Sequence, residues 1–230
     1  DVCSSDLAAA RTRLEILQPF SAQLASTDLP DGKVLLRMEA VTAGYDPDKP
    51  VLDRISFNIT GPERIAVVGP NGSGKTTLLG LITGALKPWS GTVSLRTDHV
   101  LLDQTVSLLD PQASIRDNFR RINPRADENV CRAALARFMF RADAALQPVA
   151  LLSGGQLLRA GLACVLCGPA PPPLLILDEP TNHLDLDSIA AVEAGLAAYD
   201  GALLAVSHDR AFLDAIGIDR RLELPFGKDG

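Results

Sequence analysis

Short aliphatic runs alternate with stretches of helical character along most of the chain, from Val34 onward. The aliphatic runs predict strands at Val34–Val41, Val51–Ile59, Arg64–Val68, Thr92–Leu95, Val100–Leu102, Leu174–Leu177, Ala202–Val206 and Arg221–Leu224. The other patterns predict helices at Lys75–Leu86, Ile115–Arg121, Glu128–Arg141, Gly154–Cys167, Ser188–Tyr199 and Arg210–Ile216. This alternation indicates an α/β fold with a mainly parallel sheet. The continuous apolar run at 174–177 is typical of a parallel strand that is covered on both faces.

The pattern divides the chain into a core and two flanking pieces. Residues 34–224 carry the strand and helix alternation, and the helices between about 112 and 168 are predicted to form an insert on that core. Residues 1–33 predict one helix at Leu7–Gln18 and a turn at Asp31-Gly32, so we expect the tail of a linker. Residues 225–230 are a short tail. The chain starts at Asp1, and we expect it to be a piece of a longer protein.

Composition favours a soluble globular protein without membrane insertion. The 230 residues are 47% hydrophobic and 22% charged. The longest uncharged stretch, Ala160–Leu177, is broken by Pro169 and by Pro171–Pro173, so it cannot form a membrane helix. The start of the chain also lacks the basic and apolar regions of a secretory signal. We therefore expect a cytoplasmic protein.

Charge is uneven along the chain. The net charge of −6 argues against nucleic-acid binding by the whole surface. Residues 113–150, however, contain seven arginines and only four acidic residues, which gives this stretch a local net charge of +3. The arginines are Arg116, Arg120, Arg121, Arg125, Arg132, Arg137 and Arg141. This stretch is either a solvated helical face or a contact surface for RNA or an acidic partner.

The four cysteines do not form a framework of disulfides or metal ligands. Cys164 and Cys167 have C-x-x-C spacing, but no second pair or histidine cluster accompanies them, which disfavours zinc. They are predicted to be small buried hydrophobes on a helix. Cys3 and Cys131 are isolated, and the whole pattern suits a reducing compartment.

Residues 69–76 read Gly-Pro-Asn-Gly-Ser-Gly-Lys-Thr, which is the phosphate-loop pattern G-x-x-x-x-G-K-[ST]. Glycines let consecutive backbone N–H groups converge on phosphate oxygens, and the following helix contributes its positive N-terminus. Lys75 is expected to reach the β- and γ-phosphates, and Thr76 to ligate Mg²⁺. The alternative is a glycine-rich turn before a helix.

A second nucleotide element follows at Leu174–Pro180, where a buried strand ends in two acids. Open α/β sheets bind ligands at the carboxyl ends of their strands. Asp178 is expected to hold Mg²⁺, and Glu179 to orient and deprotonate the water that attacks the γ-phosphate. The alternative is two structural acids beside a turn proline. The two motifs together predict ATP binding.

Further motifs make the sequence resemble the ATP-binding cassette (ABC) ATPases from residue 34 to about 224. Leu152-Ser153-Gly154-Gly155-Gln156 matches the signature sequence of that family, and Ser207-His208-Asp209 matches its switch histidine. Gln104 matches the family's glutamine that senses Mg²⁺ and the attacking water, Leu184-Asp185 matches the D-loop, and Tyr45 matches the aromatic that stacks on adenine. The resemblance implies a P-loop NTPase cassette with an added antiparallel β part and a helical subdomain that carries the signature.

The resemblance also implies which residues hold the ligands. The residues implied to bind ATP are Tyr45, Gly69, Asn71, Gly72, Ser73, Gly74, Lys75, Thr76, Thr77, Ser153, Gly154, Gly155, Gln156 and Asp185. Those implied to hold Mg²⁺ are Thr76, Gln104 and Asp178, and those implied to act in catalysis are Glu179, His208 and Gln104. His183 is expected only to shape its turn.

In the resembled family the signature sequence contacts an ATP held by a different cassette. Ser153 and the amides of Gly154 and Gly155 begin a helix and so form a second anion site. Two cassettes must therefore face each other head to tail, either two copies of this chain or this chain and a cassette encoded upstream. ATP would favour the closed pair, and hydrolysis would release it.

Three functional classes remain open from the sequence. The segment Leu177–Asp185 resembles the soluble F subfamily, whose members act on ribosomes through contacts with rRNA or tRNA, in translation or antibiotic protection. The stretch from Lys75 to Gln104 is only 29 residues, shorter than in most transporter ATPases. These features favour the second cassette of an F-subfamily protein. The alternatives are the ATPase subunit of a membrane transporter and a regulator that uses ATP only as a dimerisation ligand, although the intact Glu179 and His208 speak against the latter.

Overall fold

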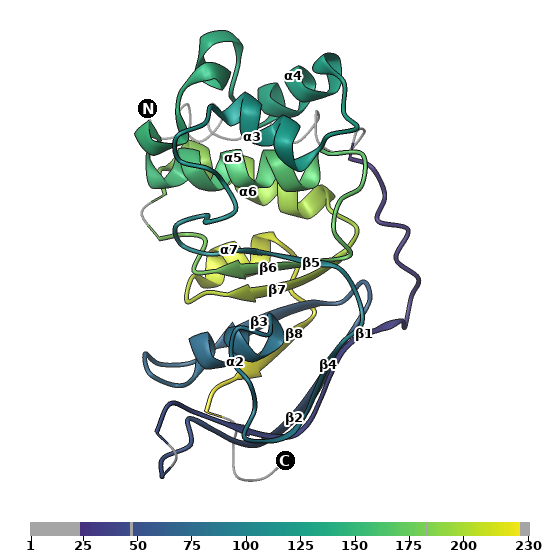
Figure 1. Cartoon of the computed structure of the whole chain (residues 1–230), viewed down its shortest axis with the longest axis vertical. Coiled ribbons are helices and arrows are strands. Elements are labelled where there is room, and N and C mark those ends of the chain that lie inside the picture. Colours follow the sequence, from purple (N-terminus) through teal and green to yellow (C-terminus); the bar gives the residue numbers. More distant parts are fainter. Residues whose placement is uncertain (1–23, 47, 183, 226–230) are drawn as a thin grey trace, which may run out of the picture.

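The computed structural model describes residues 24–46, 48–182 and 184–225 of the chain (Figure 1). The predicted Leu7–Gln18 helix, Cys3, His183 and residues 226–230 lie outside the described residues.

Two β-sheets form the body of the protein (Figure 1). A five-stranded parallel sheet has the order β5-β6-β7-β3-β8. Its strands are β3 (Arg64–Val68), β5 (His99–Leu102), β6 (Leu174–Asp178), β7 (Ala202–Val206) and β8 (Arg220–Glu223). An antiparallel sheet has the order β2-β1-β4. Its strands are β1 (Val34–Ala43), β2 (Leu52–Thr60) and β4 (Ser90–Leu95). The α/β fold with a mainly parallel core and an antiparallel part is thus confirmed.

The helices cover the parallel sheet on both faces, and each face has its own core. Helix α2 lies between the two sheets, and its leucines pack with both of them. On the opposite face the other helices form a second, larger core. The helices are α2 (Lys75–Ile82), α3 (Ile115–Ile122), α4 (Glu128–Arg137), α5 (Gly154–Leu166), α6 (Leu186–Ala198) and α7 (Arg210–Ala215). Two short 3₁₀ helices, η1 (Ala142–Leu146) and η2 (Val149–Leu151), precede α5.

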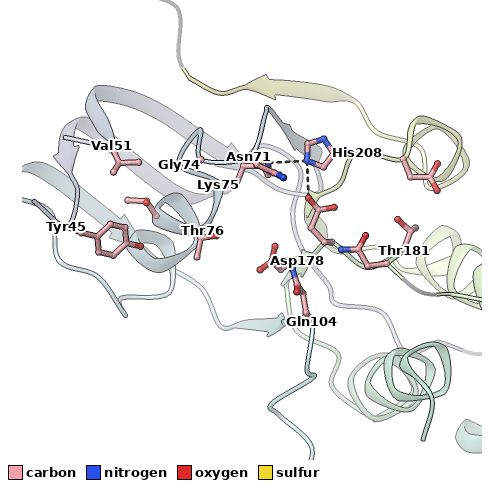
Figure 2. Close-up of a pocket in the computed structure, with 15 residues that line it drawn as sticks. Tyr45, Val51, Asn71, Gly74, Lys75, Thr76, Gln104, Asp178, Thr181 and His208 are labelled. Atoms are coloured by element: carbon pink, nitrogen blue, oxygen red, sulfur yellow. Dashed lines mark hydrogen bonds and ion pairs between the residues drawn. The ribbon is translucent and has the colours of Figure 1, made fainter. Parts of the chain in front are cut away.

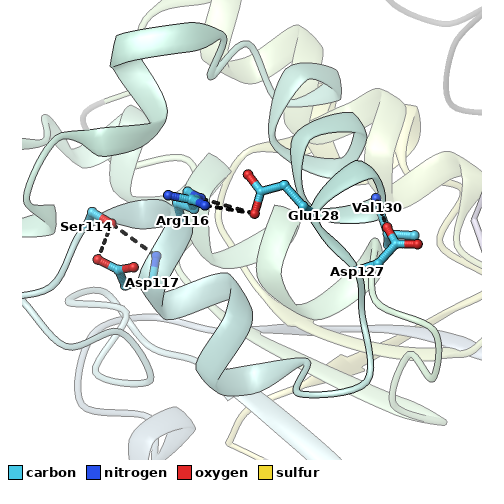
Figure 3. Close-up of polar contacts among 6 residues, drawn as sticks. All are labelled: Ser114, Arg116, Asp117, Asp127, Glu128 and Val130. Carbon is cyan, nitrogen blue, oxygen red and sulfur yellow. Dashed lines mark hydrogen bonds and ion pairs between the residues drawn. The ribbon is translucent and has the colours of Figure 1, made fainter.

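Helices α3 to α7 each begin at a side chain that accepts a hydrogen bond from a backbone N–H of the first turn. The capping residues are Ser114, Asp127, Ser153, Asp185 and Asp209. Figure 3 shows the first two caps and the exposed ion pair between Arg116 and Glu128, at 2.9 Å, that joins α3 to α4. Helix α2 differs, because Gly74 precedes it and supplies no side-chain cap. Its first-turn N–H groups are thus left for another acceptor.

Most predicted elements are confirmed, and two helices end four residues earlier than predicted. The helix after the phosphate loop stops at Ile82 instead of Leu86, because Gly84 adopts φ +77°. Helix α4 stops at Arg137 instead of Arg141, because Met139 takes the left-handed conformation at φ +69°. Left-handed residues end helices, and the apolar pattern alone did not reveal them.

Cys131, Cys164 and Cys167 are buried and unpaired, which confirms the prediction for the last two. Burial raises the pKa of the Cys167 thiol to about 11, and it raises the pKa of the Cys164 thiol further. They remain protonated hydrophobes. Among the described helices, none combines the length and apolar character required to cross a bilayer.

Candidate functional site

The phosphate loop connects β3 to α2 and has a backbone that side chains would block. Gly72 and Gly74 adopt φ +80° and +101°, conformations that favour glycine. A Cβ atom on Gly69 would lie 2.3 Å from the backbone oxygen of Leu224, which no side chain could tolerate. The loop therefore brings bare backbone and the uncapped N-terminus of α2 to one place. Such a cradle of N–H groups binds anions.

Lys75, the first residue of α2, points back across the loop. Its Nζ donates to the backbone oxygens of Gly69 at 2.7 Å and Pro70 at 3.2 Å. The same Nζ lies 3.1 Å from Nε2 of His208, which follows β7 (Figure 2). A cation is thus held over the loop by carbonyl groups, close to a histidine from a distant segment.

His208 connects Lys75 to Glu179. Its Nε2 lies 3.2 Å from Oε1 of Glu179, while its side chain remains half exposed. Nε2 donates to Glu179 when it carries the proton and accepts from Lys75 when it does not. A chain of three polar groups therefore spans the ends of β3, β6 and β7 (Figure 2).

The two acids at the end of β6 differ in their surroundings. Burial raises the pKa of the Asp178 carboxyl, and the nearby charges of Glu179 and Asp103 raise it further, although Lys75 opposes them. Glu179 takes the left-handed φ +49°, and its N–H donates to the backbone oxygen of Val206 at 2.8 Å. Positive φ in a non-glycine residue is strained and recurs at functional sites. With this backbone conformation Glu179 lines the cavity.

These residues line one cavity of about 770 Å³ beside the loop (Figure 2). Tyr45, at 70% exposure, borders its outer side, and Gln104 reaches it from the segment after β5. The residues predicted from sequence that line it are Tyr45, Asn71, Gly72, Gly74, Lys75, Thr76, Thr77, Gln104, Asp178, Glu179 and His208. Gly69 and Ser73 belong to the same loop but do not line the cavity; Ser73 is buried, and a Cβ atom on Gly69 would lie 2.7 Å from its Oγ.

The predicted signature residues lie away from this cavity. Ser153 to Gln156 form the start of α5, and Asp185 caps the start of α6. The side chain of Gln156 accepts from the N–H of Ser153 at 2.9 Å, which completes a capping box. Within the described chain the predicted ATP-binding residues thus fall into two separate groups.

Four residues of the cavity do not belong to the predicted set: Val51, Thr181, Asn182 and Asp209. Thr181 and Asn182 follow the acid pair after Pro180, so their position close to Glu179 in the sequence was an available signal. Asp209 caps α7, and a Cβ atom on Gly74 would lie 3.1 Å from Cγ1 of Val51. These two neighbours depend on the packing of separate elements, which spacing does not reveal.

The donor set fits a nucleoside triphosphate with a divalent cation. The loop and Lys75 provide positive groups for phosphate, and the hydroxyl of Thr76 with the carboxylate of Asp178 provides hard oxygen ligands of the kind that Mg²⁺ prefers. The raised pKa of Asp178 is the expected mark of a carboxylate whose charge lacks a counter-ion. An exposed aromatic ring at the rim suits a base.

Comparison with known proteins points to the same chemistry. A protein-family model described as ABC transporter matches residues 52–182. YdiF of Bacillus subtilis is 42% identical over 195 residues, which cover 84% of this chain and 30% of YdiF. ABC transporter F family member 5 of Arabidopsis thaliana is 35% identical over 240 residues, which cover 95% of this chain and 33% of that protein. The chain therefore spans about a third of the length of these relatives.

Solved structures agree with the fold. A metal-chelate type ABC transporter in an inward-facing conformation superposes with a TM-score of 0.66 at 26% identity, covering 84% of this chain and 79% of that one.

Proposed function

This chain belongs to the ABC transporter family as an ATP-binding domain, and from that premise we propose that it hydrolyses ATP with the help of Mg²⁺. The observation that carries the proposal is the convergence of Lys75, His208 and Glu179 within 3.2 Å contacts in one cavity. These residues come from three segments of the chain, and the fold brings a cation, a histidine and a strained acid together beside the phosphate loop. The reaction transfers the terminal phosphoryl group of ATP to water.

Each residue of the cavity has a role in this proposal. The phosphate loop binds the phosphate chain, with Lys75 and His208 as donors toward its end. Glu179 accepts the proton of the attacking water, and Gln104 orients that water. Thr76, Gln104 and Asp178 would hold Mg²⁺, which would supply positive charge to neutralise the phosphate groups. Tyr45 would stack on the adenine.

We propose further that Ser153 to Gln156 and Asp185 serve the ATP of a second cassette. They are separated from the cavity of their own chain, and they stand at the N-termini of α5 and α6 where an anion is favoured. ABC cassettes work as pairs, and a head-to-tail pair would bring these residues to the partner's phosphates. The second cassette is either another copy or a further part of the same protein.

We place the chain in the F subfamily, as the second cassette of a protein that acts on ribosomes in the cytoplasm. The Arabidopsis relative carries that subfamily's name, and the chain covers only a third of it, which leaves room for another cassette. The amino-acid sequence of Leu177–Asp185, which resembles that of the F subfamily, also supports this assignment. The likeness to a transporter ATPase keeps a transporter subunit as the second candidate.

The hydrolysis proposal is tested by Glu179→Gln, which keeps the shape of the side chain but removes the base. Turnover should fall by about 10²-fold or more, while ATP still binds in a fluorescent-nucleotide titration. Glu223→Gln, on an exposed position of β8, is the matched control and should turn over normally. Unchanged hydrolysis in Glu179→Gln would refute the assignment of the base.

The F-subfamily proposal is tested by sedimentation of the full-length protein with ribosomes. The Glu179→Gln variant with ATP should co-sediment with ribosomes, and ADP should abolish the association. Co-purification with membrane-spanning subunits instead would favour the transporter.

A further inference from the structure

The segment after β5 is folded around the carboxylate of Asp103, the residue next to Gln104. Oδ1 of Asp103 accepts from the N–H and the hydroxyl of Thr105, both at 2.9 Å, and from the N–H of Ser107 at 3.0 Å. Oδ2 accepts from the hydroxyl of Ser107 at 2.5 Å. Burial would raise the pKa of Asp103, but these hydrogen bonds outweigh it and lower the pKa, so the group stays ionised. One carboxylate thus organises the following four residues.

Gln104 is enclosed in this arrangement. The N–H of Val106 donates to the backbone oxygen of Asp103 at 3.0 Å, which closes a turn with Gln104 at its second position. The side-chain bonds from Asp103 span the same turn. The backbone of Gln104 therefore has little freedom, although its side chain is exposed and lines the cavity.

Val106, at the far end of the turn, packs against helix α5. Val106 takes φ +46°, which is strongly unfavourable for a β-branched residue, and it is only 2% exposed. A Cβ atom on Gly161 would lie 2.7 Å from Cγ1 of Val106, so the valine occupies space that only a glycine in α5 leaves open. Two elements thus hold the turn: the carboxylate of Asp103 at one end and the Val106–Gly161 contact at the other.

We propose that Asp103 is a positioning residue that holds Gln104 toward Asp178 and Glu179, with the Val106–Gly161 contact tying this turn to the helix that begins with the signature sequence. The inference rests on the proposed function, because it explains how Gln104, the residue proposed to orient the attacking water, is held in position. Gln104, Asp178 and Glu179 line the same cavity, so a turn that fixes Gln104 acts next to the proposed reacting groups (Figure 2).

The first test is steady-state ATP hydrolysis by the full-length protein carrying Asp103→Ala. The turnover number should fall on the order of 10-fold to 100-fold while KM stays within about twofold, because displaced catalytic groups lose rate and not binding. Asp110→Ala is the matched control: Asp110 closes a similar turn on the N–H of Gln112 at 2.9 Å, outside the cavity, and should turn over normally.

A double-mutant cycle separates positioning from general structural damage. If Asp103 acts through Gln104, the double variant Asp103→Ala/Gln104→Ala should be no slower than Gln104→Ala alone. Losses that multiply, with a lowered melting temperature, would overturn the inference. Should Asp103→Ala fail to fold, Ser107→Ala and Thr105→Ala each remove one side-chain bond and should each lower the turnover number about twofold to tenfold.

The second test is steric. Gly161→Ala should lower the turnover number, because its methyl group displaces Val106, and Gly161→Ala/Val106→Ala should recover at least half of the loss. An unchanged turnover number in Gly161→Ala would show that the Val106–Gly161 contact does not affect the position of Gln104. Wild-type protein without Glu179-dependent hydrolysis would reject the proposed function itself, whereas normal wild-type turnover with an unaffected Asp103→Ala would reject only the inference.

Discussion

At the scale of single residues, the ionised form of Asp178 is unfavourable in the folded chain. Burial is the main cause that raises the pKa of its carboxyl, and the charges of Glu179 and Asp103 raise the pKa further. Because its pKa is raised above the unfolded value of about 4, the stability that Asp178 contributes is present when it is protonated and is lost as pH rises through the folded pKa. At neutral pH the residue therefore destabilises the nucleotide-free protein, a cost that a bound cation would relieve.

We predict that Asp178→Asn is more stable than wild type when no nucleotide is present. The melting temperature at pH 7 should rise by about 1–3 °C, and the gain should disappear near pH 3, where the wild-type carboxyl is protonated as well. The variant should also lose the stabilisation that ATP with Mg²⁺ gives to wild type. Differential scanning calorimetry measures both effects, with the exposed Asp98→Asn as a control. A lower melting temperature at pH 7 would contradict this account of the site.

At the scale of elements, the start of α5 is packed against α6 through a glycine. A Cβ atom on Gly155 would lie 2.6 Å from Oγ and 2.9 Å from Cβ of Ser188, in the first turn of α6. The Ser188 hydroxyl is buried, with no hydrogen-bond partner among the described residues. Since Asp185 caps the same turn of α6 at 2.7 Å, the signature segment and the predicted D-loop are packed as one unit.

We expect Gly155→Ala to lower the free energy of unfolding by about 1–3 kcal/mol, because the added methyl group overpacks this crossing. Ser188→Gly should restore most of the loss in the double variant, and Ser188→Ala alone should be neutral or stabilising, since it deletes an unpaired buried hydroxyl. Urea unfolding of the four proteins measures the coupling. Independent effects of the two substitutions would show that the helices do not meet as described.

At the scale of the whole molecule, residues 24–33 run along the outside and contact both cores (Figure 1). Leu24 packs with the helical core, and Leu29 packs with the core between the sheets. Asp200 holds the segment between them, accepting from the hydroxyl of Ser26 at 2.7 Å and the N–H of Thr27 at 3.0 Å. Burial would raise the pKa of Asp200, but these hydrogen bonds outweigh it and lower the pKa.

Asp200→Ala should therefore release the segment in a pH-dependent way. A lowered pKa means that the stabilisation is present above the unfolded pKa of about 4 and is lost as pH falls through the folded pKa. The difference in melting temperature between wild type and variant should be largest at pH 7 and shrink toward pH 3. Hydrogen exchange at the Thr27 amide should be faster in the variant at pH 7, with the exposed Asp143→Ala as a control. Equal exchange in both proteins would show that Asp200 does not hold this segment.

The separation of the two groups of predicted ATP-binding residues makes a prediction about assembly. With ATP and Mg²⁺, Glu179→Gln should elute from size exclusion as a pair, because the ligand would be held between two cassettes and not hydrolysed. The same protein with ADP should elute as a single cassette. A monomer under both conditions would count against self-pairing and leave pairing with a different cassette.

Much of the fold followed from the sequence because its local signals are strong. Strands β3 and β7 begin and end at the predicted residues, since the aliphatic runs are bounded there by glycine or by a charged or polar residue. Helix ends were less predictable. Met139 takes a left-handed conformation that its residue type does not favour, and only its surroundings impose it.

The sequence by itself determined the phosphate loop, the acid pair and the parallel core, because each depends on residue types at short spacing. The tertiary structure decided which of these residues meet. The sheet order β5-β6-β7-β3-β8 is not the chain order, and it brings Gln104, Glu179, His208 and Lys75 together at one edge. It also decided that Ser153 to Gln156 lie apart from that edge and that Asp103 and Gly161 hold the turn of Gln104. Such contacts join residues far apart in the chain through packing, and packing is a property of the folded molecule that spacing along a sequence does not contain.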